Sequence, residues 1–251
     1  RIVAVGDLHG DLEATLDVLY MAGVVDSNGE WAGGNNTILV QTGDILDRGP
    51  DTVPLLELFP RLAKEANKVG GRVIQILGNH ELMNLAGDYR YVNPADKGFA
   101  GPMSRYLAFS QHGRFGQRLL DLPLVHQIGD TVFAHGGITP EWARKNIHTV
   151  NTFAAKKLRE LTSVVNPAKY SDVPVLGLEG PAWYRGYALG NERVVCAALK
   201  RALDIMGVKQ MVTGHTLQNK GQVLTRCDGR LFVIDVGISR AYKGAQAAID
   251  I

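Results

Sequence analysis

The sequence places polar side chains that could bind metal ions directly after short apolar runs. Asp7 and His9 follow the run Ile2-Val3-Ala4-Val5, in the motif Gly6-Asp7-Leu8-His9-Gly10. Similar motifs follow later apolar runs: Gly43-Asp44-Ile45-Leu46-Asp47-Arg48-Gly49, Gly78-Asn79-His80-Glu81, His135-Gly136-Gly137 and Gly214-His215. Because open α/β sheets bind ligands outside the carboxyl ends of their strands, we expect these side chains to converge on one edge.

The types of donor atom predict a site for two metal ions. Carboxylate, imidazole and amide oxygen donors without a thiolate suit zinc, iron or manganese. Two ions can be held if one aspartate bridges them, and the candidate ligands are Asp7, His9, Asp44, Asn79, His135 and His215. Two ions about 3.5 to 4 Å apart lower the pKa of a bound water and hold phosphoryl oxygens. The expected nucleophile for phosphoester hydrolysis is therefore hydroxide and not a side chain.

Further polar residues complete the predicted chemistry. Arg48, and Arg185 in Tyr184-Arg185-Gly186, carry planar guanidinium groups that suit non-bridging phosphate oxygens. We expect Asn79 to contribute to phosphate binding as well as to the metal site. His80 is placed to protonate the leaving alkoxide or phenoxide, and Asp47 could orient its imidazole as a hydrogen-bond partner.

Each motif taken alone has a simpler interpretation. A Gly-Asp pair after a strand is most often a turn with a helix cap, and a single histidine is more often a hydrogen-bonded core residue. Five such sites together favour the metal interpretation. Arg48 and Arg185 could each be ordinary salt-bridge partners. Glu81 could cap a helix or support the ligands from outside, so we do not count it among them.

The elements that must position these residues predict an α/β sandwich in a single domain, residues 1–251. Apolar runs predict strands at 2–5, 38–40, 73–77, 131–134 and 210–213. Helices are expected at about 12–20 and 52–68, each after a strand. A hairpin is expected between 222–225 and 231–235, around Asp228-Gly229. Weak periodicity predicts loops at about 87–121, as a cap over the active face, and at 166–182.

Composition argues against several functional classes. The formal net charge is +2 over 251 residues with interspersed charges, so we expect neither a nucleic-acid-binding tail nor a membrane-binding patch. No run approaches the roughly 18 apolar residues of a membrane span, and a cytoplasmic location is the default. The sequence begins at Arg1, which leaves a preceding targeting segment open. Cys196 and Cys227 are expected to be packing residues, with a disulfide left open. The oligomeric state is not predicted.

The ordered motifs resemble those of the phosphoprotein phosphatase family of metallophosphoesterases, over residues 6–215. The resemblance implies a calcineurin-like β-sandwich flanked by helices, with the active site at the carboxyl ends of the strands. It also implies that Asp7, His9 and Asp44 hold the first metal, and that the second is held by Asp44, Asn79, His135 and His215. His80 is implied as general acid with Asp47 as its partner, and the phosphate clamps are Arg48 and Arg185.

One departure points to a branch of this family. Eukaryotic Ser/Thr members carry Ser-Ala-Pro-Asn-Tyr after the last strand, whereas this chain has Val236-Gly237-Ile238-Ser239-Arg240. The chain is therefore similar to the bacterial-like branch and specifically to the Shewanella-like protein phosphatases. Plant members of that branch imply a preference for phosphotyrosine, with phosphoserine or phosphothreonine as the other protein substrates. The cap at 87–121 would then form a wall of the substrate pocket.

Two other functions compete with a protein phosphatase acting on a phosphoprotein or phosphopeptide. A diadenosine tetraphosphate hydrolase of the same superfamily shares the first three motifs, but those enzymes usually show Gly-Asn-His-Asp where Glu81 stands here. A non-catalytic phosphoprotein-binding module would keep the cleft for docking. Degenerate relatives lose ligands first, and this chain lacks none of those expected.

Overall fold

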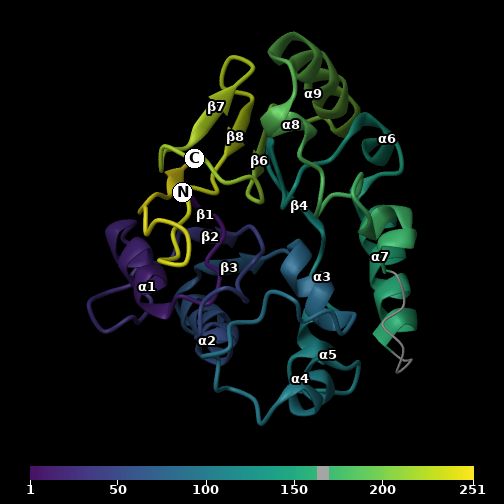
Figure 1. Ribbon diagram of the computed structural model, residues 1–251. Coiled ribbons are helices and arrows are strands. Elements are labelled where there is room, and N and C mark those ends of the chain that lie inside the picture. Colours follow the sequence, from purple (N-terminus) through teal and green to yellow (C-terminus); the bar gives the residue numbers. More distant parts are fainter. Residues whose placement is uncertain (163–169) are drawn as a thin grey trace.

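A computed structural model describes residues 1–162 and 170–251. It contains two β-sheets packed face to face, with helices on the outer face of each sheet, as Figure 1 shows. This arrangement confirms the predicted α/β sandwich flanked by helices.

The first sheet contains the strands that carry the first three motifs. Its order is β3-β2-β1-β9, with β1 at Ile2–Val5, β2 at Ile38–Gln41, β3 at Arg72–Gln75 and β9 at Ile249–Asp250. The first three strands are parallel in the register Ile2↔Ile38↔Arg72, so their carboxyl ends meet at one edge. The third strand ends two residues earlier than predicted, because Ile76 and Leu77 already belong to the loop before the Gly78 motif.

The second sheet carries the remaining two motifs. Its order is β4-β5-β6-β8-β7, and the strands are β4 at Val125–Ile128, β5 at Thr131–Ala134, β6 at Gln210–Thr213, β7 at Leu224–Arg226 and β8 at Leu231–Val233. β5, β6 and β8 run parallel, whereas β7 pairs with β8 in the predicted antiparallel hairpin. β4 was not predicted.

The space between the sheets is filled by side chains from both. The inward-facing residues are Ala4, Val40, Ile76, Phe133, Val212 and Ile234. Their sequence neighbours Val3, Val5 and Leu39 point to the other face, where they pack against helices. Successive strand residues face opposite sides, and burial of both sides explains why these strands are uniformly apolar.

Two helices cover the first sheet. In α1, Leu12–Met21, the Asp11 side chain caps the N-terminus by accepting from Ala14 N. In α2, Thr52–Val69, the buried face includes Leu55, Phe59 and Leu62 at helical spacing. Both helices were predicted.

The helices on the second sheet were largely missed. They are α3 at Asn79–Leu85, α6 at Pro140–Ala143, α7 at Ile147–Thr162, α8 at Gly186–Leu189 and α9 at Glu192–Met206. In α7 the buried residues Val150, Ala154, Leu158 and Thr162 recur every four positions. A narrow stripe of this kind indicates a helix less clearly in the sequence than the broad apolar face of α2 does.

The segment predicted as loops at 87–121 also contains helices, which corrects that expectation. They are α4 at Pro102–Phe109 and α5 at Gly116–Leu119. Both are short, and each begins after a glycine or within a Gly-rich stretch. Helices of this length contain too few residues to show a helical repeat of apolar positions in the sequence. In the other predicted loop, 166–169 lie outside the described residues, and the rest contains the 3₁₀ turns η1 at Tyr170–Asp172 and η2 at Pro174–Leu176.

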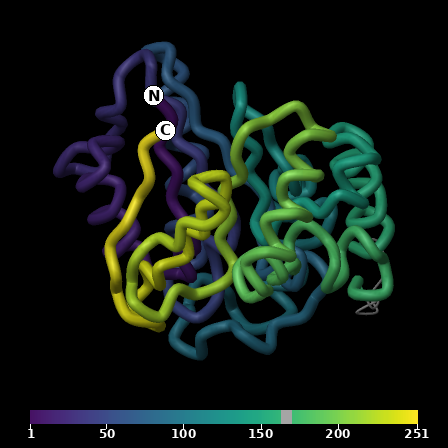
Figure 2. Tube along the Cα trace, turned by 90° about the horizontal axis from the view of Figure 1, so that it is seen from above, coloured from purple at the N-terminus to yellow at the C-terminus, as the bar shows by residue number. Residues whose placement is uncertain are grey.

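The two ends of the chain meet on the first sheet. The backbones of Ile2 and Ile251 exchange two hydrogen bonds of 3.1 and 2.9 Å, and the N and C labels lie side by side in Figure 2. Within 1–162 and 170–251, none of the helices combines the length and the apolar character that a bilayer crossing requires. Assignment of all 251 residues to one domain stays a prediction.

A disulfide joins α9 to the β7–β8 hairpin. It links Cys196 to Cys227 across a sequence separation of 31 residues. The disulfide that the sequence left open is therefore formed, so the two cysteines do more than pack. Glu192 at the start of α9 holds the hairpin beside the helix, because it accepts from Cys227 N at 3.1 Å and from Arg226 Nε at 2.5 Å.

We predict that reduction of this disulfide lowers stability by about 3 to 4 kcal/mol, because a cross-link of this loop length restricts the unfolded chain. Thermal unfolding with and without dithiothreitol would measure the change. A variant carrying both Cys196→Ser and Cys227→Ser should unfold at the lower temperature in either buffer. Equal unfolding temperatures for the oxidised and reduced protein would contradict the prediction.

Candidate active site

The predicted metal ligands meet around the carboxylate of Asp44. Asp44 Oδ2 lies 3.2 Å from His135 Nε2, 3.7 Å from His9 Nε2 and 3.9 Å from His80 Nε2. All four side chains are buried. Residues from three different strand ends therefore converge on one oxygen atom.

Asp7, Asn79 and His215 lie at the border of the same cluster. Asp7 Oδ2 is 3.8 Å from His9 Nε2, and both Asp7 oxygens accept from the backbone N–H of His215 at 3.1 and 3.2 Å. Asn79 Oδ1 lies 3.0 Å from His135 Nε2. All six predicted ligands are therefore brought together.

Within this cluster, two groups of side chains have the spacing of a metal site, and they share Asp44. One comprises His9, Asp44 and His80, and the other comprises Asp44, His135 and His215. In each group the donor atoms lie within 4.8 Å of one another. An aspartate common to both groups is what a pair of bridged ions requires. The first group includes His80, which the sequence placed outside the ligand set.

Three histidines use one ring nitrogen on a backbone carbonyl and turn the other toward the cluster. The outer contacts are His9 Nδ1 to Leu46 O at 3.3 Å, His135 Nδ1 to Thr42 O at 2.8 Å and His215 Nε2 to Trp183 O at 2.9 Å. A carbonyl only accepts, so each outer nitrogen carries a proton and the inner one is directed at the cluster, where it could offer a lone pair to a metal ion. Metal-binding histidines are held in this way.

The inner nitrogens fit a bound cation. His215 Nδ1 is buried and has no hydrogen-bond partner among the described residues. His135 Nε2 lies within hydrogen-bond distance of the oxygens of both Asp44 and Asn79. Burial lowers the pKa of His135, but Asp44 and Asp7 outweigh it and raise the pKa to about 10, so a proton occupies this position where a bound cation would take its place. The donor set contains carboxylate, imidazole and amide oxygen, which suits manganese, iron or zinc.

Negative charge is concentrated in the same place. Burial, together with the nearby Asp235, raises the pKa of Asp7 well above its ordinary value. Burial raises the pKa of Asp235 to about 6. Burial would also raise the pKa of Asp44, but His135 and His80 hold it well below the ordinary range. Three carboxyl groups thus share one buried region, and Asp235 was not identified from the sequence.

The loops that carry these residues are unusually bent. Positive φ angles occur at His9 (42°), Asp44 (56°), Asp47 (68°), Arg48 (69°) and His215 (66°). Such angles are uncommon for residues other than glycine, and where they persist the surrounding structure holds them. Five candidate site residues are therefore fixed in orientations that a relaxed loop would not keep.

Glycines allow these loops to approach closely. A Cβ atom at Gly78 would collide with the Asp44 carboxylate, and one at Gly214 would collide with Asp7 Oδ1. Glu81 ties the loops together by accepting from the backbone N–H groups of Asp44 (2.8 Å), Ile45 (2.9 Å) and Gly78 (2.7 Å). Glu81 therefore supports the loops that carry the candidate ligands.

His80 is paired with Asp47 as predicted. Its Nδ1 lies 2.8 Å from Asp47 Oδ2, and the same oxygen accepts from Asn84 Nδ2 at 2.9 Å. Burial lowers the pKa of His80, but Asp44 and Asp47 outweigh it and raise the pKa above its ordinary value.

Arg105 completes this network and was missed by the sequence analysis. Its guanidinium donates to Asn84 Oδ1 at 2.7 Å, to Asp96 Oδ2 at 2.8 Å and to Asp47 Oδ1 at 3.0 Å. The side chain is only 4% exposed. Arg105 lies in α4, within the segment that was expected to form loops, and it belongs to none of the motifs identified in the sequence. No sequence signal separates it from a surface arginine.

The two predicted phosphate-binding arginines lie at the border of the cluster. The Arg48 guanidinium is 3.9 Å from the centre of the Tyr91 ring. Arg185 Nη1 donates to His215 O at 2.6 Å. In the part of the chain that the structure describes, neither forms an ion pair with a carboxylate, so the salt-bridge interpretation is not supported.

Aromatic side chains surround the histidines. The Tyr242 ring lies 4.9 Å from that of His9, the Tyr91 ring 5.3 Å from His80 and the Trp183 ring 5.8 Å from His215. All three aromatic residues are partly exposed. Tyr91 comes from the segment expected to wall the pocket, whereas nothing in the sequence placed Tyr242 or Trp183 here.

Comparison with known proteins shows similarity over nearly the whole chain. Residues 1–219 match the family model described as calcineurin-like phosphoesterase. Shewanella-like protein phosphatase 2 of Arabidopsis thaliana is 32% identical, covering 96% of this chain and 72% of that protein. Shewanella-like protein phosphatase 1 of Plasmodium berghei is 33% identical, covering 95% and 67%. The crystal structure of a cold-active protein-tyrosine phosphatase of a psychrophilic Shewanella species matches with a TM-score of 0.79 at 28% identity, covering 98% and 73%.

We predict that Arg105→Met destabilises the protein by about 3 to 5 kcal/mol, because it leaves Asp47 and Asp96 buried without their cation. Urea unfolding would measure the change. Arg90→Met is the matched control, because Arg90 pairs with Asp88 while 65% exposed and its loss should change stability little. Equal effects of the two substitutions would show that the buried network contributes no more than a surface pair.

Proposed function

Because this chain belongs to the calcineurin-like phosphoesterases, and within them to the Shewanella-like protein phosphatases, we propose that it hydrolyses phosphotyrosine in proteins with the help of two metal ions. It is a phosphatase. The substrate, the ions and the roles of individual residues are the parts proposed.

The ligand set divides naturally at Asp44. We assign Asp7, His9 and Asp44 to one ion and Asp44, Asn79, His135 and His215 to the other. The shared position of Asp44 and the free ring nitrogen of His215 support this division. Bound manganese, iron or zinc would supply Lewis acidity, which activates water for attack on phosphorus and offsets charge on the phosphoryl oxygens.

His80 is assigned as the general acid, with Asp47 as its partner. Asp47 accepts from the Nδ1 side of the ring, which leaves Nε2 on the side of the cluster where a leaving oxygen would depart. The Asn84 and Arg105 contacts hold Asp47 in place, so the imidazole keeps one orientation. General acids contribute through such fixed positions.

Arg48, Arg185 and Asn79 are assigned to the phosphate group. Neither arginine is committed to a carboxylate of the described residues, so both keep N–H donors for phosphate oxygens. The Asn79 amide lies within the cluster, and its nitrogen can donate while its oxygen faces the metal side.

The aromatic side chains around the histidines are the main support for phosphotyrosine as the substrate. Tyr91, Tyr242 and Trp183 are partly exposed next to the three histidines on which the phosphate would lie. Aromatic rings pack edge to face or offset against a phenyl ring and contribute beyond the buried area. A phosphoseryl side chain has no ring to use this surface. The solved relative described as a protein-tyrosine phosphatase gives the same indication.

Removal of the metal tests the first part of the proposal. Protein stripped with a chelator should lose activity and regain it with manganese, iron or zinc. The reconstituted protein should hydrolyse a phosphotyrosyl peptide faster than the matching phosphoseryl peptide or diadenosine tetraphosphate. Faster hydrolysis of the dinucleotide would instead establish the rival hydrolase, and phosphopeptide binding without turnover would establish a docking module.

His80→Ala should lower turnover by about 100-fold or more while the metal content stays near that of the wild type, because His80 acts on the leaving group. Elemental analysis beside steady-state kinetics would measure both quantities. His112→Ala, at an exposed position, is the matched control. Loss of metal from the His80 variant would show that this side chain is a ligand.

Arg185→Ala should mainly weaken inhibition by inorganic phosphate, by about 10-fold, because one charge-assisted contact is lost. Inhibition constants for phosphate would be compared with those of Arg193→Ala, an exposed arginine on α9. An unchanged inhibition constant would leave Arg185 with a structural role only, through its bond to His215 O.

A further inference from the structure

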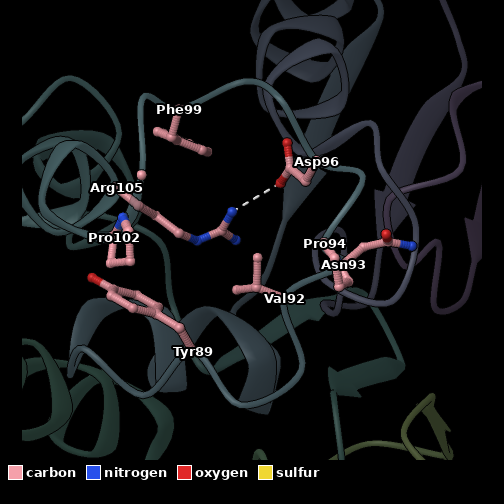
Figure 3. Close-up of a pocket in the computed structure, with 9 residues that line it drawn as sticks. Tyr89, Val92, Asn93, Pro94, Asp96, Phe99, Pro102 and Arg105 are labelled. Atoms are coloured by element: carbon pink, nitrogen blue, oxygen red, sulfur yellow. Dashed lines mark hydrogen bonds and ion pairs between the residues drawn. The ribbon is translucent and has the colours of Figure 1, made fainter.

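A hollow of about 250 Å³ lies beside the candidate active site, in the segment that follows α3. We call it the cap pocket and define it by Tyr89, Val92, Pro94, Phe99, Pro102 and Arg105. Figure 3 shows the Arg105 side chain extending between the Phe99 ring and the side chains of Val92 and Tyr89. Asn93, Asp96 and Gly101 also line the hollow, and apart from Arg105 the six defining residues offer mainly aromatic and aliphatic surface.

The charges of the cap pocket are already paired. Arg105 donates to Asp96, Asn84 and Asp47, and its guanidinium also lies 4.9 Å from the Phe99 ring. The Asp96 side chain is only 1% exposed, and its other oxygen accepts from Gly98 N. A ligand in the pocket therefore meets apolar walls and finds no unpaired carboxylate or cation.

The cap pocket is joined to the proposed phosphate site by a short backbone segment. Arg48 N donates to Tyr91 O at 3.0 Å, and Asn93 Nδ2 donates to Arg48 O at 2.6 Å. Val92 stands between these two residues and faces the pocket. The Arg105 bond to Asp47 makes a second connection, to the partner of His80.

The apolar surface continues onto the neighbouring helix. Met103 and Leu107 lie four positions apart on α4, hence on one face, and are 66% and 59% exposed. The helix begins at Pro102, which lines the pocket. Pocket and helix face together offer a path for an extended apolar segment leading away from the active site.

We propose that the cap pocket binds an apolar side chain of the phosphoprotein substrate, located within a few residues of the phosphotyrosine. This inference rests on the proposed function and refines its substrate class. The volume is below the roughly 300 to 1,000 Å³ of small-molecule sites, and it suits one large side chain. A lysine or glutamate would lose water here without gaining an opposite charge, because the charged residues of the pocket are already paired.

A set of phosphotyrosyl peptides tests the proposal. Leucine, alanine or lysine would be placed singly at each position from four before to four after the phosphotyrosine. At one position, leucine should raise kcat/KM about 10-fold over alanine, and lysine should not. Hydrolysis of p-nitrophenyl phosphate, which has no flanking residue, would be measured as the reference for each protein.

Substitution at Val92 locates the effect. Val92→Asp should reduce the ratio of kcat/KM for the leucine and alanine peptides to near one and favour the lysine peptide. Val92→Thr, which keeps the shape of valine, should reduce the ratio less. It keeps the test informative if Val92→Asp does not fold. Met21→Asp, at a 56% exposed position on α1, should leave the ratio as in the wild type.

The outcomes separate the two proposals. Leucine preference at no position, or a preference that survives Val92→Asp, would overturn the cap-pocket inference while leaving the phosphatase proposal intact. Hydrolysis of p-nitrophenyl phosphate without hydrolysis of any phosphopeptide would overturn the proposed protein substrate and the cap-pocket inference together.

Discussion

Several acidic side chains are buried together where the strands of the two sheets end. The repulsion between their carboxylates is the constraint on which the site depends. Asp7, Asp44 and Asp235 lie in one region with imidazoles whose inner ring nitrogens face the carboxylates. Buried charge is costly unless it is paired or coordinates a metal. The arrangement becomes favourable when cations are bound, so the features that make the site unstable alone are the ones that give it metal affinity.

The backbone around the cluster is held by the rest of the fold. Parallel strands in register deliver the loops to one edge, and glycines let those loops come within contact distance. Glu81 then satisfies three buried N–H groups at once. These contacts offset the cost of left-handed backbone at residues such as Asp44 and His215. The ligands are therefore fixed before any ion or substrate arrives.

The segment after α3 connects chemistry with recognition. Arg105 holds Asp47, which orients His80, and it also forms the floor of the cap pocket. Tyr91 and Asn93 contact Arg48 from the same segment. A single stretch of chain thus supports the proposed acid, the proposed phosphate-binding arginine and the proposed surface for the substrate.

The sequence by itself determined the candidate metal ligands, the pairing of His80 with Asp47 and the parallel strands that carry them. Each of these is a local pattern, because a ligand follows its own strand and a glycine stands beside it. The tertiary structure decided the rest: Asp235 near Asp7, the aromatic surround, the Cys196–Cys227 disulfide and the place of Arg105. Arg105 reaches Asp47 across 58 residues. Such contacts depend on how separate elements pack against one another, and the local sequence pattern around each residue does not predict that packing.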